Sequence, residues 1–499
     1  MVNNYHFARL KTKSVKWCLS ALLLATCVLD ASSAERMVGM GVEKDSIPFS
    51  QVIACGLPVL DIATVDGEWP DGEYVRAPSG YSGKSIINAT NVPGRMKLYE
   101  QGVVTFDTGD FLDGVRGMKI KIRGNSSAFG DKKPYKLTLQ QKADLMFRNN
   151  PSYRDKDWLL IRDDMLKTMQ GFEINRLLGM AWTPAYRYVN VVINDDYQGI
   201  YMLVESVKRN VSCRLSVAKD GFIVEHDTYW WTESYHVISH MYQGRHYTFK
   251  YPDADELTRA DKTFIKERLD AYETSINNGT YPEYLDVMSM AKWCLGQDLL
   301  ATSDAGGVNR FYTLNDRQPG TLLVVPLMWD FDSAEFNEGR WSRPHLVLMG
   351  MFFNNVNRAF VDAYVSAWQE VSPGLPTKMM SLFANFTLTP EGKGFAASID
   401  LNNLRWDTQF LSGVNLSDRG FWFYSRVAWL EKAIGKLNPP YDVDINGVVD
   451  VSDLNQLINM MIHKVPTNLR VADFNHDGDV DTDDMNILVN VLIRKLADS

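Results

Sequence analysis

Cysteine and histidine are scarce in this sequence: 499 residues contain 5 Cys and 8 His. The cysteines are odd in number and irregularly spaced, which excludes a disulfide framework and a zinc site built on closely spaced Cys pairs. Three of them, Cys55, Cys213 and Cys294, lie beyond the N-terminal hydrophobic segment. We expect buried free thiols. One disulfide bond among the three is the alternative if the compartment is oxidising.

The sequence also lacks an excess of basic residues. The formal net charge is −9, and the last 59 residues alone contain 11 Asp against 4 Lys or Arg. A nucleic-acid partner is therefore not expected. Hydrophobic content of 45% and aromatic content of 12% are typical of a globular protein. A chain of this length predicts at least two domains.

Long apolar runs are missing after the N-terminus. The run Leu19–Leu29 follows four basic residues and precedes Ser32-Ser33-Ala34. This order is typical of a signal peptide at 1–34, and the run is short for a membrane span. A retained anchor or a buried first helix remains the alternative. We expect a secreted or cell-surface protein without a transmembrane span in the mature chain; a lipid anchor at Cys27 is less favoured.

Hydrophobic periodicity organises the middle of the chain. Residues 118–122 and 133–139 alternate between apolar and polar side chains around a Gly/Ser loop, which predicts a β-hairpin. Further strands are expected at 188–193, 199–204 and 222–227, and helices after Asp163, at 258–277 and at 288–300. The expected organisation is a β-rich N-terminal segment at 35–97, a main domain at 98–437, a linker at 438–440 and a tail at 441–499.

The stretch Ser303–Asp332 contains the residues most suggestive of chemistry. Asp304 and Asn309 have the spacing D-x-x-x-x-N, and a predicted buried strand then leads to Asp330 and Asp332 in W-D-F-D. Phosphoryl transfer needs a carboxylate that orients the attacking hydroxyl, and an amide and a second carboxylate that hold Mg²⁺. Asp and Asn also cap turns and helices, so the spacing alone leaves a structural role open.

An ordered set of motifs between Leu98 and Ala433 resembles the CotH-type atypical protein kinases, a family named after spore coat protein H. The set comprises R-G-N-S at 123–126, K-K-x-Y at 132–135, W-x-L at 158–160, T-P at 183–184, N-x-x-Y-x-G-x-Y-x-L-x-E at 194–205 and W-D-F-D at 329–332. Each motif is weak by itself, whereas their common order is specific. One departure is Lys167, where the family often has Arg; Lys is no bidentate substitute for Arg on a phosphate.

The resemblance implies an α+β fold with a two-lobed atypical protein-kinase-like domain. It implies transfer of the ATP γ-phosphate, with Mg²⁺ or Mn²⁺, to Ser/Thr of a protein substrate. Asp304 then corresponds to the catalytic base, and Asn309 and Asp330 are metal ligands. Asp332 is either a further metal ligand or a residue that braces the loop.

The resemblance also implies an ATP-binding set, with these members: Arg123, Lys133, Lys136, Glu173 and Glu205. Side chains alternate between the two faces of a strand, so only one of the two lysines is expected in the cleft, and Lys133 is preferred. Its acidic partner is either Glu173 on a helix or Glu205 on a strand.

The tail contains an acidic loop twice, with an offset of 31 residues. Oxygen ligands at alternate positions, a Gly at the turn and a final carboxylate form an EF-hand-like calcium loop. The expected ligands are Asp442, Asp444, Asn446, Val448, Asp450 and Asp453 in the first loop, and Asp473, Asn475, Asp477, Asp479, Asp481 and Asp484 in the second. Val448 and Asp479 contribute backbone carbonyls.

A helix with an apolar stripe is predicted after each loop. Two such loop–helix units resemble a type I dockerin, a small all-α module. The resemblance implies folding around two Ca²⁺ ions and binding to a cohesin-type scaffold. Because the convergent carboxylates repel one another, folding and Ca²⁺ binding should be coupled. Packing of the apolar stripe on the chain's own body is the alternative.

Three functions remain after the sequence is read. The first is an exported atypical protein kinase, docked to a scaffold or surface by the dockerin. The second is a catalytically inactive kinase-like binding module of a surface complex. The third is nucleotidyl transfer on the same fold, since a fold does not fix its chemistry.

Overall fold

A computed structural model describes residues 47–162, 165–233, 235–239, 245–302, 309–334, 342, 358–406, 416–435, 437, 440–444, 446, 448–475 and 477–497. The predicted signal peptide at 1–34 lies outside these residues. The chain divides into two compact units. The first comprises Met1–Leu166, Pro184–Ser206 and Gly374–Phe423, and the second comprises Lys167–Thr183, Val207–Pro373 and Tyr424–Ser499.

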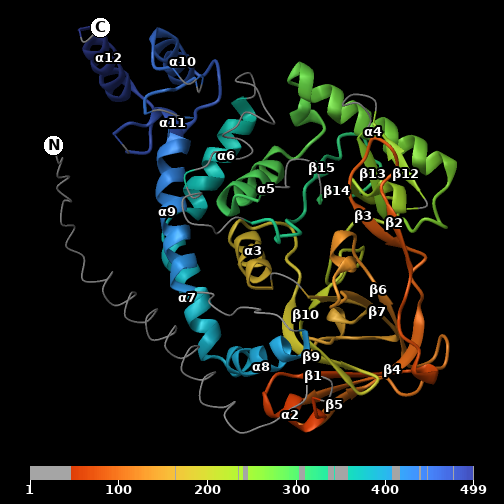
Figure 1. Ribbon diagram of the computed structural model, residues 1–499. Helices are drawn as coiled ribbons and strands as arrows, with labels where there is room; N and C mark the ends of the chain where they lie inside the picture. The colour runs from red at the N-terminus through yellow and green to blue at the C-terminus, as the bar shows by residue number, and fades with distance from the viewer. Residues whose placement is uncertain are drawn as a thin grey trace. The chain divides into compact units, whose positions relative to one another are not determined.

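The first unit is built around a β-sheet that closes on itself (Figure 1). Its strands are β1 (Val59–Thr64), β4 (Val92–Glu100), β6 (Met118–Ile122), β7 (Tyr135–Ala143), β8 (Asp155–Ile161), β9 (Tyr186–Ile193) and β10 (Asp196–Glu205). The order is β1-β9-β10-β8-β7-β6-β4, and β1 also pairs with β4, so the described strands form a closed seven-stranded barrel. The β1–β9 pair is parallel, which makes the barrel mixed.

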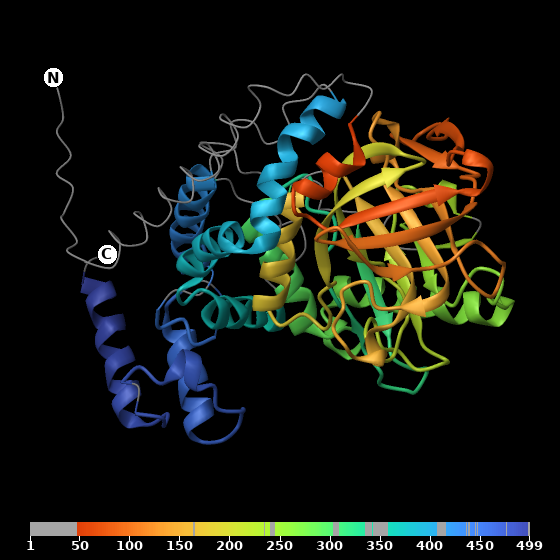
Figure 2. The ribbon, with the colours of Figure 1, turned by 90° about the horizontal axis from the view of Figure 1, so that it is seen from below.

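Alternation of side chains fills the barrel interior. Along β6, Met118, Ile120 and Ile122 are buried while the lysines between them are partly exposed. Tyr135 and Leu137 on β7 continue the same interior face. Figure 2 shows the orange and yellow strands curving around this interior. The predicted hairpin is confirmed, with Ile120 opposite Leu137 in the β6–β7 register.

The expected two-lobed kinase-like architecture is wrong. A closed barrel with helices later in the chain replaces it. The physical reason lies in β1 and β4, which come from or begin in the β-rich N-terminal segment and pair with each other from Val59↔Tyr99 to Thr64↔Gly94. Their pairing, together with β1 against β9, removes the two open edges that the sheet would otherwise have.

Helices and short strands surround the barrel within the first unit. They are α2 (Phe49–Ala54), β2 (Glu73–Arg76), β3 (Lys84–Ile87), β5 (Val103–Asp107), α7 (Leu375–Leu388) and α8 (Pro390–Trp406). Helix α8 packs on β9 and β10 (Figure 1). Arg405 near its end binds Asp196 at 2.7 Å, and Tyr188 on β9 packs edge-on against Phe395 at 4.7 Å.

The second unit contains a five-stranded sheet in the order β12-β13-β11-β14-β15. Its strands are β11 (Phe222–His226), β12 (His236–Ile238), β13 (His246–Tyr251), β14 (Arg310–Leu314) and β15 (Leu323–Val324). Its helices are α3 (Met165–Leu177), of which the first two residues belong to the first unit, α4 (Arg259–Asn278), α5 (Val287–Leu300), α6 (Arg358–Val371) and α9 (Leu416–Gly435), which begins in the first unit. The helices predicted after Asp163, at 258–277 and at 288–300 are thereby confirmed.

The described part of the tail adds these helices to the second unit: α10 (Val451–Met461), α11 (Leu469–Ala472) and α12 (Thr482–Ala497). The apolar stripes of α10 and α12 meet, because Leu457, Leu488 and Leu492 share one buried cluster. The predicted stripes therefore cover each other in part, since Ile462 and Ile493 stay exposed, and Val361 of α6 packs against the same cluster.

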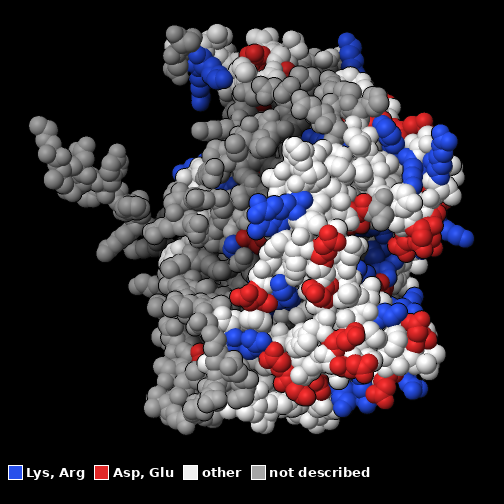
Figure 3. Space-filling model, turned by 45° about the vertical axis from the view of Figure 1, so that its right-hand side comes forward, with Lys and Arg blue, Asp and Glu red and all other residues white. Residues whose placement is uncertain are grey.

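Surface charges agree with the absence of a basic excess. In Figure 3 blue and red side chains are interspersed over the described part of the visible face. No described helix combines the length and the apolar character needed to span a membrane.

Candidate functional site

Asn309 and Asp330 meet at one end of the second unit's sheet. Asn309 directly precedes β14, and Asp330 follows the buried segment after β15. Because β14 and β15 are antiparallel, with Thr313 opposite Val324, the start of one strand and the extension of the other reach the same end. The Nδ2 atom of Asn309 donates to Oδ2 of Asp330 at 2.9 Å.

Both residues have left-handed backbone conformations. The φ angles are 58° at Asn309 and 65° at Asp330. Asn and Asp adopt this region at lower cost than other residues with a Cβ, so the fold itself favours these types. Non-glycine residues in this region also cluster at functional sites. The side chains of the pair offer oxygen ligands for a metal ion. Since Asn309 donates through its nitrogen, its amide oxygen remains for a hard cation. A neighbouring carboxylate is the other ligand type that Mg²⁺ prefers.

The W-D-F-D segment is fixed against helix α3. The ring of Phe331 is buried and lies edge-on to Phe172 at 5.6 Å. A Cβ on Gly171 would come within 2.3 Å of the Phe331 ring, so only glycine lets the ring sit here. Lys167 Nζ donates to the backbone carbonyl of Asp332 at 2.6 Å. Lys167 therefore holds the segment that presents Asp330.

Three other predicted residues belong to this unit. Asp304 lies in 303–308, outside the described residues. Glu173 on α3 is partly buried and forms an ion pair with Arg176 one turn later. Asp332 is exposed, and its backbone carbonyl accepts from Lys167.

The predicted phosphate-binding residues belong to the first unit, at one end of the barrel. Lys133 precedes β7, donates to the Ala128 carbonyl at 3.0 Å and lies 5.1 Å from the Tyr74 ring centre. Lys136 points away from the barrel interior and pairs with Asp157 at 3.1 Å. The backbone of Arg123 donates to the Pro134 carbonyl at 3.0 Å, which closes the Gly/Ser loop.

Glu205 has a partner other than the two lysines. It is 1% exposed at the end of β10, and it accepts from Arg148 at 2.8 Å and from the Ala185 N–H at 2.9 Å. Arg148 also binds Asp144 at 2.8 Å. Sequence reasoning missed Arg148, because nothing in the local pattern around residue 148 links it to a strand end 57 residues later.

Lys132 is a second residue that the sequence analysis passed over. Its side chain is buried, donates to Ile200 O at 2.6 Å and to Asn402 Oδ1 at 2.8 Å, and lies 4.6 Å from the Tyr201 ring centre. The signal was present in the K-K-x-Y motif. The motif includes Lys132, but nothing in it shows that this side chain is buried.

The two tail loops repeat each other in hydrogen bonding as well as in sequence. Asp453 accepts from the N–H groups of Asp444 and Asp450, at 3.0 and 2.7 Å. Its counterpart Asp484 accepts from Asn475 and Asp481, at 3.3 and 3.1 Å. The carboxylates wrap the backbone into the same turn in both loops.

The first loop also gathers a group of carboxylates that fits a cation. Oxygen atoms of Asp442, Asp444 and Asp453 lie within 4.8 Å of one another, and Asp442 and Asp453 are buried. Buried carboxylates are costly unless a cation or donors compensate them. The oxygen-only ligand set suits Ca²⁺.

Comparison with known proteins bears on the central part of the chain. Residues 120–364 match the family described as CotH kinase protein, which covers about half of the sequence. This chain belongs to the CotH kinase family. The CotH region includes Asn309, Asp330 and helix α3, and the tail loops lie beyond it. No curated protein matches the chain.

Proposed function

We propose that this CotH-family protein is an atypical protein kinase that transfers the ATP γ-phosphate to Ser/Thr of an exported protein. The observation that carries the proposal is the 2.9 Å hydrogen bond between Asn309 and Asp330 inside the matched region. It brings together an amide and a carboxylate that lie 21 residues apart. Those are the two ligand types by which kinases hold their metal ion.

The roles in the transfer follow from side-chain chemistry. Mg²⁺ or Mn²⁺, when bound with ATP, neutralises charge on the phosphate oxygens. Asn309 and Asp330 supply oxygen ligands, with Asp332 as a further one. Asp304 accepts the proton of the acceptor hydroxyl. That hydroxyl oxygen forms the new bond to the γ-phosphorus, and the bond to the leaving ADP oxygen breaks.

Basic side chains of the first unit are assigned to the phosphates. Lys133 is the first choice. To reach a phosphate, its ammonium group gives up one hydrogen bond, to the Ala128 carbonyl, and gains a charge-assisted contact. Lys136 and Arg123 follow. Glu205 is a poor acidic partner for the lysine, because its carboxylate is buried against Arg148.

Labelled ATP distinguishes this proposal from its rivals. The purified full chain is incubated with γ- or α-labelled ATP, Mg²⁺ or Mn²⁺, and a protein acceptor such as casein. Transfer of the γ label alone is expected of the kinase. Transfer of the α label would instead identify a nucleotidyl transferase. No transfer and no ATP binding would leave the inactive binding module.

We further propose that the tail is a calcium-binding dockerin that attaches the protein to a cohesin-type scaffold. The repeated loop geometry and the buried Asp442, Asp453 and Asp484 support Ca²⁺ binding. Large apolar side chains remain exposed on α10 and α12, including Val451 at 61% and Leu496 at 75%. Export through the segment at 1–34 provides the compartment in which such a scaffold is reached.

A further inference from the structure

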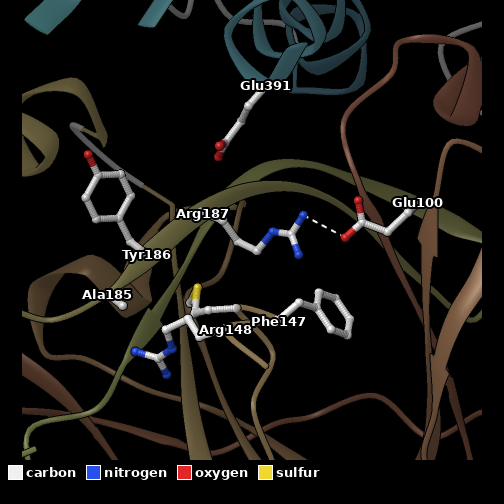
Figure 4. A pocket seen from close by; sticks show the side chains of 8 residues that line it. Glu100, Phe147, Arg148, Ala185, Tyr186, Arg187 and Glu391 are labelled. Carbon is white, nitrogen blue, oxygen red and sulfur yellow. Dashed lines mark ion pairs between the residues drawn. The ribbon is translucent and has the colours of Figure 1, made fainter. Parts of the chain in front are cut away.

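A cavity of about 410 Å³ lies within the first unit, between the end of the barrel and helix α8 (Figure 4). Its lining combines charged, aromatic and thioether side chains: Glu100, Met146, Phe147, Arg148, Tyr186, Arg187 and Glu391, with Ala185 between them. The volume lies at the lower end of the range of about 300–1,000 Å³ for small-ligand sites. None of these residues has a role in the proposed phosphoryl transfer.

The two arginines of the cavity are already compensated by carboxylates. Arg187 pairs with Glu100 at 2.7 Å, the contact drawn in Figure 4. Arg148 pairs with Asp144 and with Glu205, both at 2.8 Å. An anionic ligand would have to displace these carboxylates, so the cavity is poorly suited to a phosphate or a nucleotide.

Glu391 is the carboxylate without a matching cation. It belongs to the first turn of α8 and points toward the strand that carries Tyr186 and Arg187 (Figure 4). Its Oε1 accepts from the Tyr188 N–H at 2.5 Å, and within the described residues no ion pair includes it. Burial raises the pKa of Glu391 despite the lowering effects of that N–H and of Arg187. A cation would relieve this cost.

We propose that this cavity binds the side chain of a lysine or arginine in an extended peptide. The ammonium or guanidinium group pairs with the Glu391 carboxylate, beside the Arg187–Glu100 ion pair. The aliphatic stem covers Met146, Phe147 and Tyr186, as long basic side chains commonly cover apolar surface. The identification of the peptide as part of the acceptor protein rests on the proposed kinase function. Binding itself needs no ATP.

A peptide is favoured over a free amine because the apolar part of the cavity lining extends to the exposed rim, where a peptide backbone can cover it. Phe147 is 36% exposed at the rim, and its backbone has a φ of 53°, so the chain holds an apolar ring where a neighbouring backbone would pass. The face of this ring is near Arg187, whose guanidinium carbon lies 5.5 Å from the ring centre. A small amine would leave this rim surface uncovered.

The test measures peptide binding by calorimetry to the full chain without nucleotide. The probe is acetyl-Gly-Gly-Lys-Gly-Gly-amide, compared with the same peptide carrying norleucine and with n-butylamine. We expect binding of the lysine peptide, at least about tenfold weaker binding of the norleucine peptide, and weaker binding of n-butylamine. Equal affinity for the two peptides, or tightest binding of n-butylamine, would overturn the proposal.

Variants locate the binding in this cavity. Glu391→Gln keeps an oxygen for the Tyr188 N–H and should weaken lysine-peptide binding about tenfold. Glu100→Gln leaves Arg187 uncompensated and should weaken it at least as much. Glu68→Gln, an exposed change elsewhere in the unit, should have no effect. Wild-type affinity in both cavity variants, with unchanged thermal unfolding, would reject the assignment even if phosphoryl transfer is established. If the cavity variants lose peptide binding and the wild-type protein shows no phosphoryl transfer, the cavity assignment stands and only the kinase function is rejected.

Discussion

Lys132 binds Asn402 across 270 residues of sequence: its Nζ donates to the Asn402 Oδ1 atom at 2.8 Å inside the first unit. The same nitrogen donates to Ile200 O at 2.6 Å. The first lysine of the K-K-x-Y motif therefore joins the barrel to helix α8. The second, Lys133, is the one left for phosphate chemistry.

Replacing Lys132 should thus affect stability. Lys132→Met removes the ammonium donor from two buried acceptors, of which Asn402 Oδ1 keeps the Ile200 N–H at 3.1 Å, and we expect a loss of about 2 kcal/mol in unfolding free energy. Lys133→Met, which removes one bond to a backbone carbonyl, should cost at most about 1 kcal/mol. Denaturant unfolding followed by circular dichroism compares the two. Equal losses would contradict the division of roles.

Gly199→Ala tests the close approach of α8 to β10. Gly199 has a φ of 93°, and a Cβ there would come within 2.3 Å of Asn402 Oδ1. We expect a loss of at least about 2 kcal/mol, from backbone strain together with displacement of the amide. Gly80→Ala is the matched control, because Gly80 has a φ of 90° and nothing within 4 Å of the added carbon. The unfolding temperature should fall further in Gly199→Ala than in Gly80→Ala, and the difference measures the clash with Asn402. Equal changes in unfolding temperature would show that this close approach does not matter for stability.

Periodicity revealed the strands of the barrel but not its closure. Residues 118–122 and 133–139 alternate clearly, and their hairpin needs only a short loop. The pairing of Asp61 with both Lys97 and Val192 joins strands far apart in sequence. Alternation specifies which face of a strand is buried, whereas it does not specify the neighbour. The resemblance to a kinase therefore supplied an architecture that the described strands do not have.

Histidine burial should make the second unit sensitive to acid. Burial above all, with Arg310, Arg245 and His246 nearby, lowers the pKa of His226 to about 2. The unfolded chain binds this proton below about pH 6.5, whereas the folded chain stays neutral there. Stability is therefore complete above about pH 6.5 and falls as the pH drops below it, by up to about 1.4 kcal/mol per pH unit from this group.

The histidine prediction is checked by denaturant unfolding between pH 4.5 and 7.5. In His226→Phe the unfolding free energy should depend less steeply on pH, by the contribution of one proton. An unchanged slope in His226→Phe would show that His226 is not held neutral.

Calcium removal should unfold the tail. Asp442, Asp453 and Asp484 are buried, and once a chelator removes the ion their charges are offset only by hydrogen-bond donors such as the backbone N–H groups of the loops. Hydrogen exchange in α10 and α12 should then rise steeply, with the barrel strands unaffected. Asp453→Asn should reproduce this loss in the first loop, while Asp483→Asn, an exposed change beside a ligand, should not. Unaltered exchange after chelation would refute calcium-coupled folding.

The sequence could predict parts of the candidate site but not its supports. Spacing and residue type singled out Asn309 and Asp330, because few side chains serve a hard cation. The residues that hold the W-D-F-D segment, Gly171 and Lys167, act from a helix far away in sequence. In the sequence Glu205 resembles a partner for a lysine, whereas in the structure its carboxylate pairs with Arg148. Such contacts follow from tertiary packing and leave no local pattern.

Asp330→Asn tests the central claim most directly. Asn tolerates the left-handed backbone at position 330 and keeps an oxygen for Asn309, so the fold should be retained while a negative metal ligand is lost. We predict that γ-label transfer falls at least about a hundredfold, with a higher Mg²⁺ requirement. Asp255→Asn, an exposed change in the same unit, should transfer normally. Wild-type transfer and metal dependence in Asp330→Asn would contradict the account.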